Sequence, residues 1–266
     1  MKAALASVPP FVFNGLRLGL SALVLGLVDR LESRGRAPLS VPWRAVVGLS
    51  LLTSLGYQAL FITGIARTSA SHTGFLIASG PLWTALVARA AGVETLGRRS
   101  WLALALAFLG TSLVASTRGG SGSATWLGNA LVLLATIAWA SGTVLSRSVL
   151  ERVPATRLAL LTTLVSLPGH WLLAARELAP GRLGDIGAGA WLAIAYSGVF
   201  STGVAYVLWN WSVRTLGPSR TSAYSNLVPI VALVVAASFL GERPSAMQLV
   251  GGALILLGLS AWRAAR

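Results

Sequence analysis

The chain has 266 residues, of which 55% are hydrophobic and only 11% charged, whereas charged residues make up about a quarter of a typical soluble protein. The mean hydropathy is positive and the formal net charge is +14, so the composition is that of a basic membrane protein rather than a soluble one. The absence of cysteine and the presence of only two histidines exclude a disulfide framework and a thiolate or histidine-rich metal site.

Apolar stretches of about 20 residues, the length needed to cross the hydrocarbon core, recur along the whole chain. In chain order, bounded by Pro, Gly or Arg clusters, they cover residues 10–28, 45–66, 71–92, 101–117, 126–146, 158–175, 189–213, 219–240 and 246–262. The connections between them are short, so no soluble domain is expected. The sequence predicts an all-α, polytopic transmembrane bundle with nine helices.

The last third of the chain repeats a segment of the first half at a constant offset. The residues Ser71, Thr73, Pro81, Glu94, Leu109, Gly110 and Ser112 recur as Ser219, Thr221, Pro229, Glu242, Leu257, Gly258 and Ser260. We expect two repeats, 1–118 and 124–266, separated by the Gly-Ser-rich stretch 119–123. Internal duplication in a polytopic membrane protein is typical of carriers that build a central site between two related halves.

The start of the first repeat differs from that of the second. Val153-Pro154 follows a complete predicted helix, whereas the matching Val8-Pro9 has only seven residues before it. One helix is therefore missing from the first repeat, and we expect the natural start to lie upstream of Met1. Two five-helix repeats would be related by inverted topology, with both termini on the same side of the membrane.

The basic residues are distributed unequally between the two sides of the membrane. One side holds only Lys2, Arg67, Arg118, Arg176, Arg182 and Arg243, and the other holds all the remaining Lys and Arg residues except Arg17, which lies within a span. This bias predicts a cytoplasmic C-terminus. The arginines are scattered between apolar stretches instead of forming one basic face, so no nucleic-acid partner is expected.

Two prolines fall in the middle of predicted spans. Pro81 and Pro229 cannot donate the backbone hydrogen bond that would reach the carbonyls of Ile77 and Ser225. A carbonyl freed in this way must find another partner, and lining a water-filled cavity is one solution that the bilayer permits. A packing kink is the alternative, but the equivalent positions of the two prolines favour a hinge.

Polar and aromatic side chains within the spans are candidates for a substrate site. Burying an amide or hydroxyl without a partner costs a few kcal/mol, so such residues need a reason to be there. Hydrogen bonding between helices is the alternative to a shared cavity that takes a small zwitterion or an aromatic compound. The candidates are Gln58, which shares a helix face with Ser54, together with Trp83, Tyr206, Trp209, Asn210, Tyr224 and Asn226.

Arg17 is the only cation well inside a span, and Asn14 lies one turn away on the same helix face. Charges within the membrane usually face a partner or a water-filled path. The pair is therefore a candidate for binding a substrate carboxylate. The alternatives are that Arg17 anchors a neighbouring helix end or extends to the membrane interface.

The acidic residues all fall near helix ends or in connections, so no buried carboxylate is available for a proton relay. Glu94 and Glu242 are expected to pair with Arg98 and Arg243. Proton coupling through His170 is an alternative, but Pro168-Gly169-His170 is equally explained by a bend near the outer surface. This inventory favours facilitated export or exchange over proton-driven pumping.

Two other classes of function remain open. Ala78-Ser79-Gly80 and Ala140-Ser141-Gly142 superficially resemble the surroundings of a serine nucleophile, as in an intramembrane hydrolase, but small residues beside serine are ordinary helix packing in lipid. A channel is the second alternative, although it would not explain the duplication. We expect no catalytic residue, no metal and no cofactor.

These motifs, taken in order, resemble the EamA-type permeases of the drug/metabolite transporter superfamily. The resemblance rests on Pro9-Pro10, Leu16-Arg17, Thr68-Ser69-Ala70-Ser71, Pro81, Glu94, Leu109-Gly110, Gly217-Pro218-Ser219, Pro229, Gly241-Glu242-Arg243 and Gly251-Gly252 to Gly258. It implies ten helices in two inverted repeats and transport of small metabolites, amino acids among them, usually outward. We expect a multi-pass protein of a bacterial-type inner membrane whose partners are membrane lipid and a small-molecule substrate. The working unit is expected to be a monomer or a homodimer.

Overall fold

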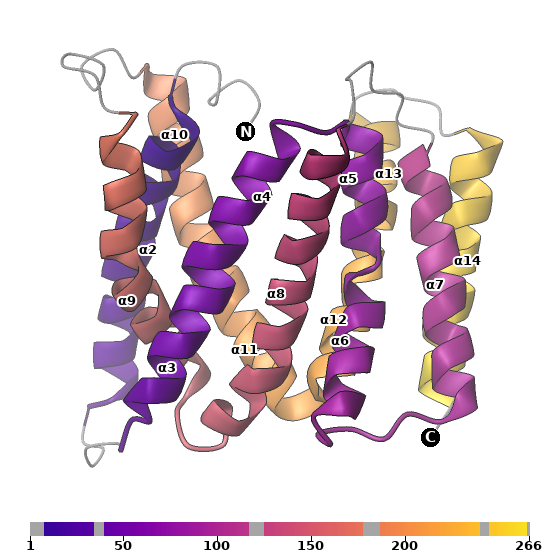
Figure 1. The fold of residues 1–266 in the computed structure, drawn as a ribbon, viewed down its shortest axis with the longest axis horizontal. Helices are drawn as coiled ribbons and strands as arrows, with labels where there is room; N and C mark the ends of the chain where they lie inside the picture. The colour runs from indigo at the N-terminus through magenta and orange to yellow at the C-terminus, as the bar shows by residue number, and fades with distance from the viewer. Residues whose placement is uncertain (1–7, 35–39, 117–124, 178–186, 240–244, 265–266) are drawn as a thin grey trace. The chain divides into compact units, whose positions relative to one another are not determined.

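The computed structural model describes residues 8–34, 40–116, 125–177, 187–239 and 245–264, and within these ranges the chain forms helices and no strands (Figure 1). The first part contains α2 (Pro10–Glu32), α3 (Trp43–Leu49), η1 (Ser50–Gly56), α4 (Tyr57–Ile65), α5 (Ala70–Ala78), α6 (Gly80–Ala90) and α7 (Arg98–Ser116). The second contains α8 (Trp126–Leu150), α9 (Ala155–Ala175), α10 (Ala188–Tyr196), η2 (Ser197–Val204), α11 (Ala205–Leu216), α12 (Pro218–Tyr224), η3 (Ser225–Leu227), α13 (Val228–Phe239) and α14 (Ala246–Ala264). Each of the nine predicted spans corresponds to one helix or one run of consecutive helices, so the all-α prediction is confirmed.

Six helical runs in the described residues are long and apolar enough to cross a membrane, and Ala246–Trp262 within α14 is a shorter apolar helix. Large apolar side chains cover the outside of these helices; Leu23 is 74% exposed and Leu192 is 71% exposed. Such surfaces are stable when they face lipid. The chain is therefore a multi-pass membrane protein.

The other two spans are interrupted helices. The helix that begins with α5 breaks at Ser79 before α6, and the helix that begins with α12 passes through the short 3-10 segment η3 before α13. Pro81 is the second residue of α6, and Pro229 is the second residue of α13. Proline fits the first turn of a helix because the backbone donor it lacks would have no helical partner there. The repeated prolines thus start the second half of each interrupted span.

Two π-helical segments interrupt other spans. η1 joins α3 to α4, and η2 joins α10 to α11. Each lies in the span that precedes one copy of the repeated segment. π-helical turns are rare and occur frequently at functional sites. The sequence analysis did not predict either of them.

The chain divides into two compact units. Unit 1 contains Met1–Leu55 and Leu145–Thr215, and unit 2 contains Gly56–Val144 and Leu216–Arg266. The boundary passes through the helical run 43–65 and through α8. Each unit contains helices from both predicted repeats, 1–118 and 124–266. The packing units therefore do not coincide with the sequence repeats.

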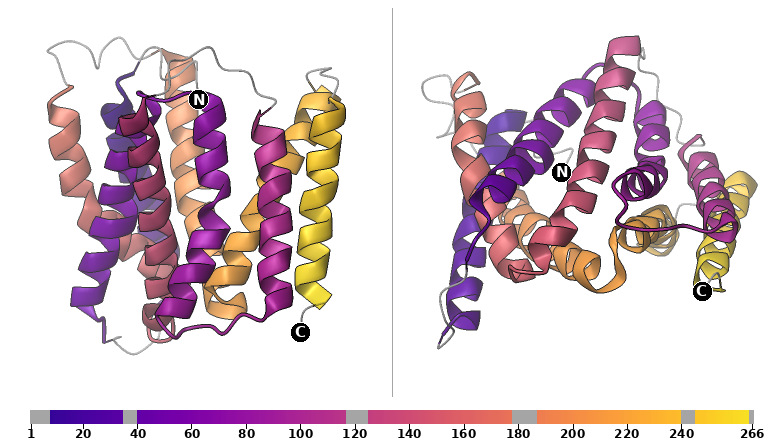
Figure 2. Two further views of the ribbon diagram at one scale, coloured as in Figure 1. Left: turned by 45° about the vertical axis from the view of Figure 1, so that its right-hand side comes forward. Right: turned by 60° about the horizontal axis from the view of Figure 1, so that its bottom comes forward.

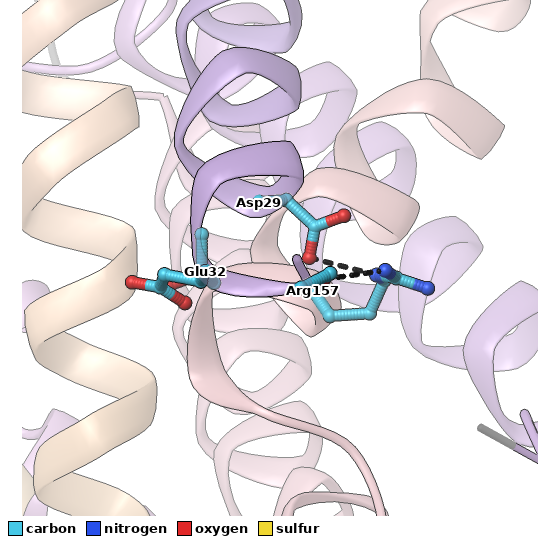
Figure 3. A network of polar contacts seen from close by, with 5 residues as sticks. Asp29, Glu32 and Arg157 are labelled. Atoms are coloured by element: carbon cyan, nitrogen blue, oxygen red, sulfur yellow. Dashed lines mark hydrogen bonds and ion pairs between the residues drawn. The ribbon is translucent and has the colours of Figure 1, made fainter. Parts of the chain in front are cut away.

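In unit 1, α2 packs along α9, and the end of α2 is fixed to the start of α9 by polar contacts. Arg157 Nε donates to Asp29 Oδ1 at 2.7 Å, and its Nη2 donates to Ser33 Oγ at 2.9 Å. Figure 3 shows this pair, with the Glu32 carboxylate directed away from Arg157. Glu32 instead accepts a hydrogen bond from Thr156 Oγ1 at 3.2 Å.

In unit 2, α7 and α14 lie side by side in every view (Figures 1 and 2) and run in opposite directions. Their backbones meet at glycines. A Cβ on Gly110 would lie 2.5 Å from the Gly251 carbonyl oxygen, and a Cβ on Gly258 would lie 2.7 Å from the Ala103 carbonyl oxygen. Gly110 and Gly258 are equivalent in the repeat, as are Ala103 and Gly251, so one contact is repeated about a local pseudo-twofold axis. Close helix packing through small residues is the usual solution in membranes.

The interrupted spans of unit 2 also run in opposite directions. In Figure 1, α5 leads down to α6, whereas α12 leads up to α13. The two copies of the repeated segment therefore have inverted topology, as the sequence predicts. We call the end of unit 2 that contains α6 and α12 the lower end, and the end that contains α5 and α13 the upper end.

Replacing Gly110 with alanine should destabilise unit 2 by about 1–3 kcal/mol, the usual cost of overpacking. The added methyl group would overlap the Gly251 carbonyl oxygen. The measurement is the thermal unfolding temperature of the purified protein in detergent. Gly252→Ala is the matched control because nothing lies within 4 Å of a Cβ there; equal unfolding temperatures for the two variants would contradict the packing described.

Candidate functional site

A cavity of about 380 Å³ lies at the upper end of unit 2, beside the interruption between α12 and α13. Its volume is within the range of about 300–1,000 Å³ typical of small-molecule sites. It is lined by residues of α5 (Gly74, Ile77, Ala78), α7 (Thr111, Val114, Ala115), and η3 and α13 (Ser225, Asn226, Val228, Pro229, Ala232). Ile77 and Val228 are exposed, so the cavity opens to the surface of the unit.

The cavity is mostly apolar, with a few polar groups. Thr111 Oγ1 donates to Asn226 Oδ1 at 3.2 Å, and Asn226 is only 2% exposed. Its Nδ2 has no hydrogen-bond partner among the described residues. Leaving a buried amide donor unsatisfied costs about 1–3 kcal/mol. A hydrogen-bond acceptor on a bound solute would remove that cost.

The lower end of unit 2 is closed, because α6 packs against α12 there. Thr84 Oγ1 donates to Ser222 Oγ at 3.0 Å, and both side chains are buried. Leu259 and Trp262 fill the neighbouring space in an apolar cluster with Ala223.

Glu94 helps to hold the closed end, in a way that corrects the sequence analysis. Glu94 and Arg98 are both among the described residues, and the ion pair expected between them does not form. Glu94 Oε2 instead accepts the backbone N–H of Ser219 at 3.3 Å, at the start of α12. A carboxylate is favourable at a helix N-terminus because of the exposed N–H groups and the helix dipole. Glu242 and Arg243 lie outside the described residues.

The repeat shows why one end is hollow and the other filled. The offset that relates Pro81 to Pro229 also relates four cavity-lining residues to four lower-end residues. In each of these four pairs the lower-end side chain is larger, whereas in the pair Val228 and Gly80 it is smaller. The pairs are Gly74 and Ser222, Ala232 and Thr84, Thr111 and Leu259, and Val114 and Trp262. Larger side chains at these four positions therefore help to fill the lower end.

Unit 1 contains a second polar cluster, centred on the predicted pair Asn14 and Arg17. Arg17 Nε donates to Asn14 Oδ1 at 2.7 Å, and Arg17 Nη1 donates to Ser197 Oγ at 3.3 Å. Asn14 Nδ2 lies 3.2 Å from His170 Nδ1. Tyr206 is close enough to Arg17 to interact with it electrostatically. The structure thus brings three predicted site residues, Asn14, Arg17 and Tyr206, into one neighbourhood.

His170 lies at the centre of this cluster rather than at a surface bend. α9 continues through Pro168 to Ala175, and His170 is 0% exposed. Its Nε2 lies 3.3 Å from Ser54 Oγ, and Ser166 Oγ donates to Ser54 Oγ at 2.8 Å. The helix assignment continues through Pro168, and His170 is buried in a polar cluster instead of lying at an exposed surface.

Both π-helical segments of the chain contribute to this cluster, Ser54 from η1 and Ser197 from η2. η2 approaches α2 closely at Gly198, where a Cβ would lie 2.8 Å from the Arg17 carbonyl oxygen. Any larger residue at this position would push η2 away from α2. The glycine therefore sets the distance at which Ser197 can accept the hydrogen bond from Arg17.

The other predicted residues of unit 1 have packing contacts on α11. Trp209 packs against the apolar cluster of Val46 and Leu158, and Asn210 Nδ2 donates to the Ala155 carbonyl oxygen at 3.4 Å. These contacts join α11 to the start of α9. The structure gives Trp209 and Asn210 a role in packing within unit 1, and their predicted substrate role stays a prediction.

In unit 2, only Asn226 and Pro229 of the predicted residues line the cavity. Trp83 Nε1 donates to Ser79 Oγ at 3.1 Å across the break before α6, and Tyr224 packs against the apolar cluster of α7 and α14. Pro81 and Gln58 are buried elsewhere in the unit. Thr111, Thr84 and Ser222 were not predicted, because serine and threonine within spans are too common to single out.

Ser79, one of the two serines that raised the hydrolase alternative, has a structural role. Its Oγ donates to the Leu76 carbonyl oxygen at 2.6 Å and accepts the Trp83 N–H. It therefore stabilises the end of α5 and the start of α6. Among the described residues no group of three His, Cys, Asp or Glu side chains could hold a metal ion.

Comparison with known proteins assigns the family. A family model described as the EamA-like transporter family matches residues 1–116 and 126–261. The chain belongs to this family. The resemblance drawn from Pro9-Pro10, Pro81, Glu94 and the second copy of the repeat is thereby confirmed.

Relatives of this EamA family chain are named as transporters. It is 26% identical over 249 residues to the uncharacterized transporter YyaM of Bacillus subtilis, covering 91% of this chain and 81% of that protein. It is 26% identical to a Salmonella typhimurium protein described as a probable amino-acid metabolite efflux pump, covering 97% and 87%. A solved crystal structure superimposes with a TM-score of 0.81 at 20% identity, covering 97% of this chain and 89% of that one, which supports the same fold.

Replacing Arg17 with glutamine should lower solute export by about tenfold or more, because hydrogen bonds to a charged group contribute about 1.5–3 kcal/mol each. The measurement is the extracellular accumulation of exported metabolites, normalised to the amount of protein in the membrane. Arg214→Gln, at an exposed position in the last turn of α11, is the control. Unchanged export by Arg17→Gln at an unchanged protein level would exclude a binding role.

Proposed function

We propose that this EamA family member is a permease that exports a small metabolite, an amino acid or a similar compound, across a bacterial-type inner membrane by alternating access. The family and the transporter names of its relatives support the general class. The name of the Salmonella typhimurium relative supports the amino-acid class. The working unit would be a monomer or a homodimer.

The observation that supports alternating access is the inequality of the two ends of unit 2. The upper end has a cavity of about 380 Å³, and the equivalent lower end is closed by the Thr84–Ser222 hydrogen bond and by Trp262. A carrier exposes its site to one side at a time, so a state with one open and one closed end is what the mechanism requires. A channel would need a continuous path.

The interrupted helices provide the moving parts in this proposal. Half-helices on either side of Ser79 and of η3 can change their relative angle without breaking a continuous hydrogen-bond ladder. Pro81 and Pro229 fix where each second half begins. Separation of α6 from α12, with approach of α5 to α13, would exchange the open and closed ends.

The arginine distribution supports the orientation of this state. Arg89 is in the last turn of α6, and Arg98 and Arg99 begin α7. Figure 1 shows this part of the chain at the lower end of unit 2. Positive residues accumulate on the cytoplasmic side. With the lower end and the C-terminus in the cytoplasm, the cavity would open to the outside, as in an exporter that has just presented its substrate.

The cavity itself favours a certain kind of solute. Its walls are mainly alanine, valine, isoleucine and proline, and its buried donor is Asn226 Nδ2. A small, partly apolar molecule with a carbonyl or carboxylate acceptor would satisfy that donor. A metabolite export screen, comparing culture media of cells with and without the protein, identifies the compound, and saturable counterflow in proteoliposomes then tests the carrier mechanism.

Filling the cavity should block transport. Gly74→Ser combined with Ala232→Thr places at the upper end the side chains that close the lower end, and we expect flux to fall at least about tenfold. A Cβ at Gly74 would lie 3.1 Å from Ala115 Cβ, so the backbone can accept it with a small shift. Initial rates of counterflow with the compound identified above provide the measurement.

Gly252→Ser is the control for the added hydroxyl, because that position has open space. The unfolding temperature shows whether each variant is folded. If the doubly substituted protein is folded and transports at the parent rate, the cavity is not on the transport path. Lipid hydrolysis or peptide cleavage by the purified protein would overturn the carrier proposal altogether.

A further inference from the structure

The cluster around His170 is a chain of hydrogen bonds with one defined direction. A guanidinium group can only donate, so the atom of Asn14 that meets Arg17 Nε at 2.7 Å must be the oxygen Oδ1. The amide nitrogen of Asn14 then faces His170 Nδ1 at 3.2 Å and donates to it. Arg17 thereby determines the orientation of the amide, and the amide determines which ring nitrogen accepts.

This direction sets the protonation state of His170. Since Nδ1 accepts from Asn14, it carries no proton, and the proton of the neutral ring is on Nε2. Nε2–H then donates to Ser54 Oγ at 3.3 Å. The Ser54 hydroxyl has two acceptor lone pairs and also accepts from Ser166. Both ring nitrogens of His170 and the Asn14 amide therefore have partners with one neutral tautomer of His170.

A second proton on His170 is incompatible with this arrangement. Protonated Nδ1–H would point at the amide nitrogen of Asn14, which also only donates. The amide would have to rotate by half a turn to present its oxygen to His170. Its nitrogen would then face Arg17 Nε, where two donors meet and the 2.7 Å hydrogen bond cannot exist.

We propose that His170 is a proton-binding site whose occupation releases Arg17 from Asn14. One proton thus exchanges the hydrogen bond between Arg17 and Asn14 for a hydrogen bond between His170 and Asn14. The released Nε–H becomes available to an acceptor on a solute. The role of this site in transport rests on the proposed function; the linkage between His170 and Arg17 does not.

The groups that face His170 come from several elements of unit 1. The charged or titratable ones among the described residues are Arg17 on α2 and Tyr206 on α11, which interacts with Arg17. η1 and α9 contribute the neutral hydroxyls of Ser54 and Ser166. Glu177, just after the end of α9, accepts the backbone N–H of Phe11 at 2.8 Å.

The linkage can be tested without knowing the substrate, by nitrogen NMR of the purified protein in lipid nanodiscs. The protein is labelled with ¹⁵N in histidine and arginine, in a His72→Gln background that leaves one imidazole. At high pH we expect the Nε2–H tautomer of His170. As the pH falls, the His170 resonances and the Nε resonance of Arg17 should change together, with one common midpoint.

Asn14→Leu is the decisive variant, because it removes the amide that connects the two side chains. In it His170 should still take up a proton, but the Arg17 Nε resonance should no longer follow. Asn14→Asp, which keeps the size of the side chain, is a second variant in case Asn14→Leu fails to fold. The aspartate carboxylate can only accept hydrogen bonds, so it should stabilise the doubly protonated ring of His170. The neutral Nε2–H tautomer should then be lost.

Three results would overturn the proposal: an Nδ1–H tautomer in the parent protein, a His170 titration that leaves Arg17 unchanged, or no titration down to the pH at which the protein unfolds. The transport readout is separate. Counterflow by the parent should change with pH, and His170→Asn, which keeps an acceptor near the Nδ1 position but takes up no proton, should abolish that dependence. Loss of transport in every variant would count against the proposed function. The NMR titration alone would then decide whether His170 and Arg17 are linked.

Discussion

The requirement that shapes this chain is that every backbone N–H and C=O in the bilayer must find a partner within the protein. Two of its spans break this continuity, at Ser79 and at η3. Hydroxyl groups add hydrogen bonds to backbone carbonyls beside each break: Ser79 Oγ donates to the Leu76 carbonyl oxygen, and Ser225 Oγ donates to the Ser222 carbonyl oxygen. Interrupted helices of this kind persist in membranes only where protein or a water-filled cavity surrounds them, and the breaks in unit 2 meet that condition.

The duplication gives the two ends of unit 2 similar backbones, and their difference comes from side chains. Glycines hold α7 and α14 together by a contact that the pseudo-twofold axis repeats at Gly110 and Gly258. Beside this repeated helix packing, Val114 at the upper end corresponds to Trp262 at the lower end. The bulk of that tryptophan and the Thr84–Ser222 hydrogen bond help to close the lower end, whereas a cavity lies at the upper end. Because the helix packing is repeated and the side chains differ, the side chains at each end can change without changing the fold.

Features set by local sequence could be predicted, and features set by pairing in space could not. Apolar length located the nine spans, and Pro81 and Pro229 located the interruptions, because proline acts on its own backbone. The partner of Glu94 was missed because Arg98 is the nearer basic residue in sequence. In space, the Glu94 carboxylate reaches the N-terminus of α12 instead. The burial of His170 was missed because its partners, Asn14 and Ser54, come from two other helical segments that are distant in sequence. The π-helical segments have no sequence signal as plain as proline.

The π-helical segments connect the local irregularities to the polar interior of unit 1. A π turn inserts a residue and so shifts the face that the following turns present. η1 and η2 present Ser54 and Ser197 to opposite ends of one hydrogen-bonded chain, from His170 to Arg17. Loss of either π turn would rotate its serine away from the cluster by a substantial part of a helical turn, even though no contact at the cluster itself had been changed. The arrangement of Arg17 therefore depends on backbone irregularities in two other helices, and a conformational change that converts η1 or η2 to regular α-helix would alter the cluster without any substitution in it.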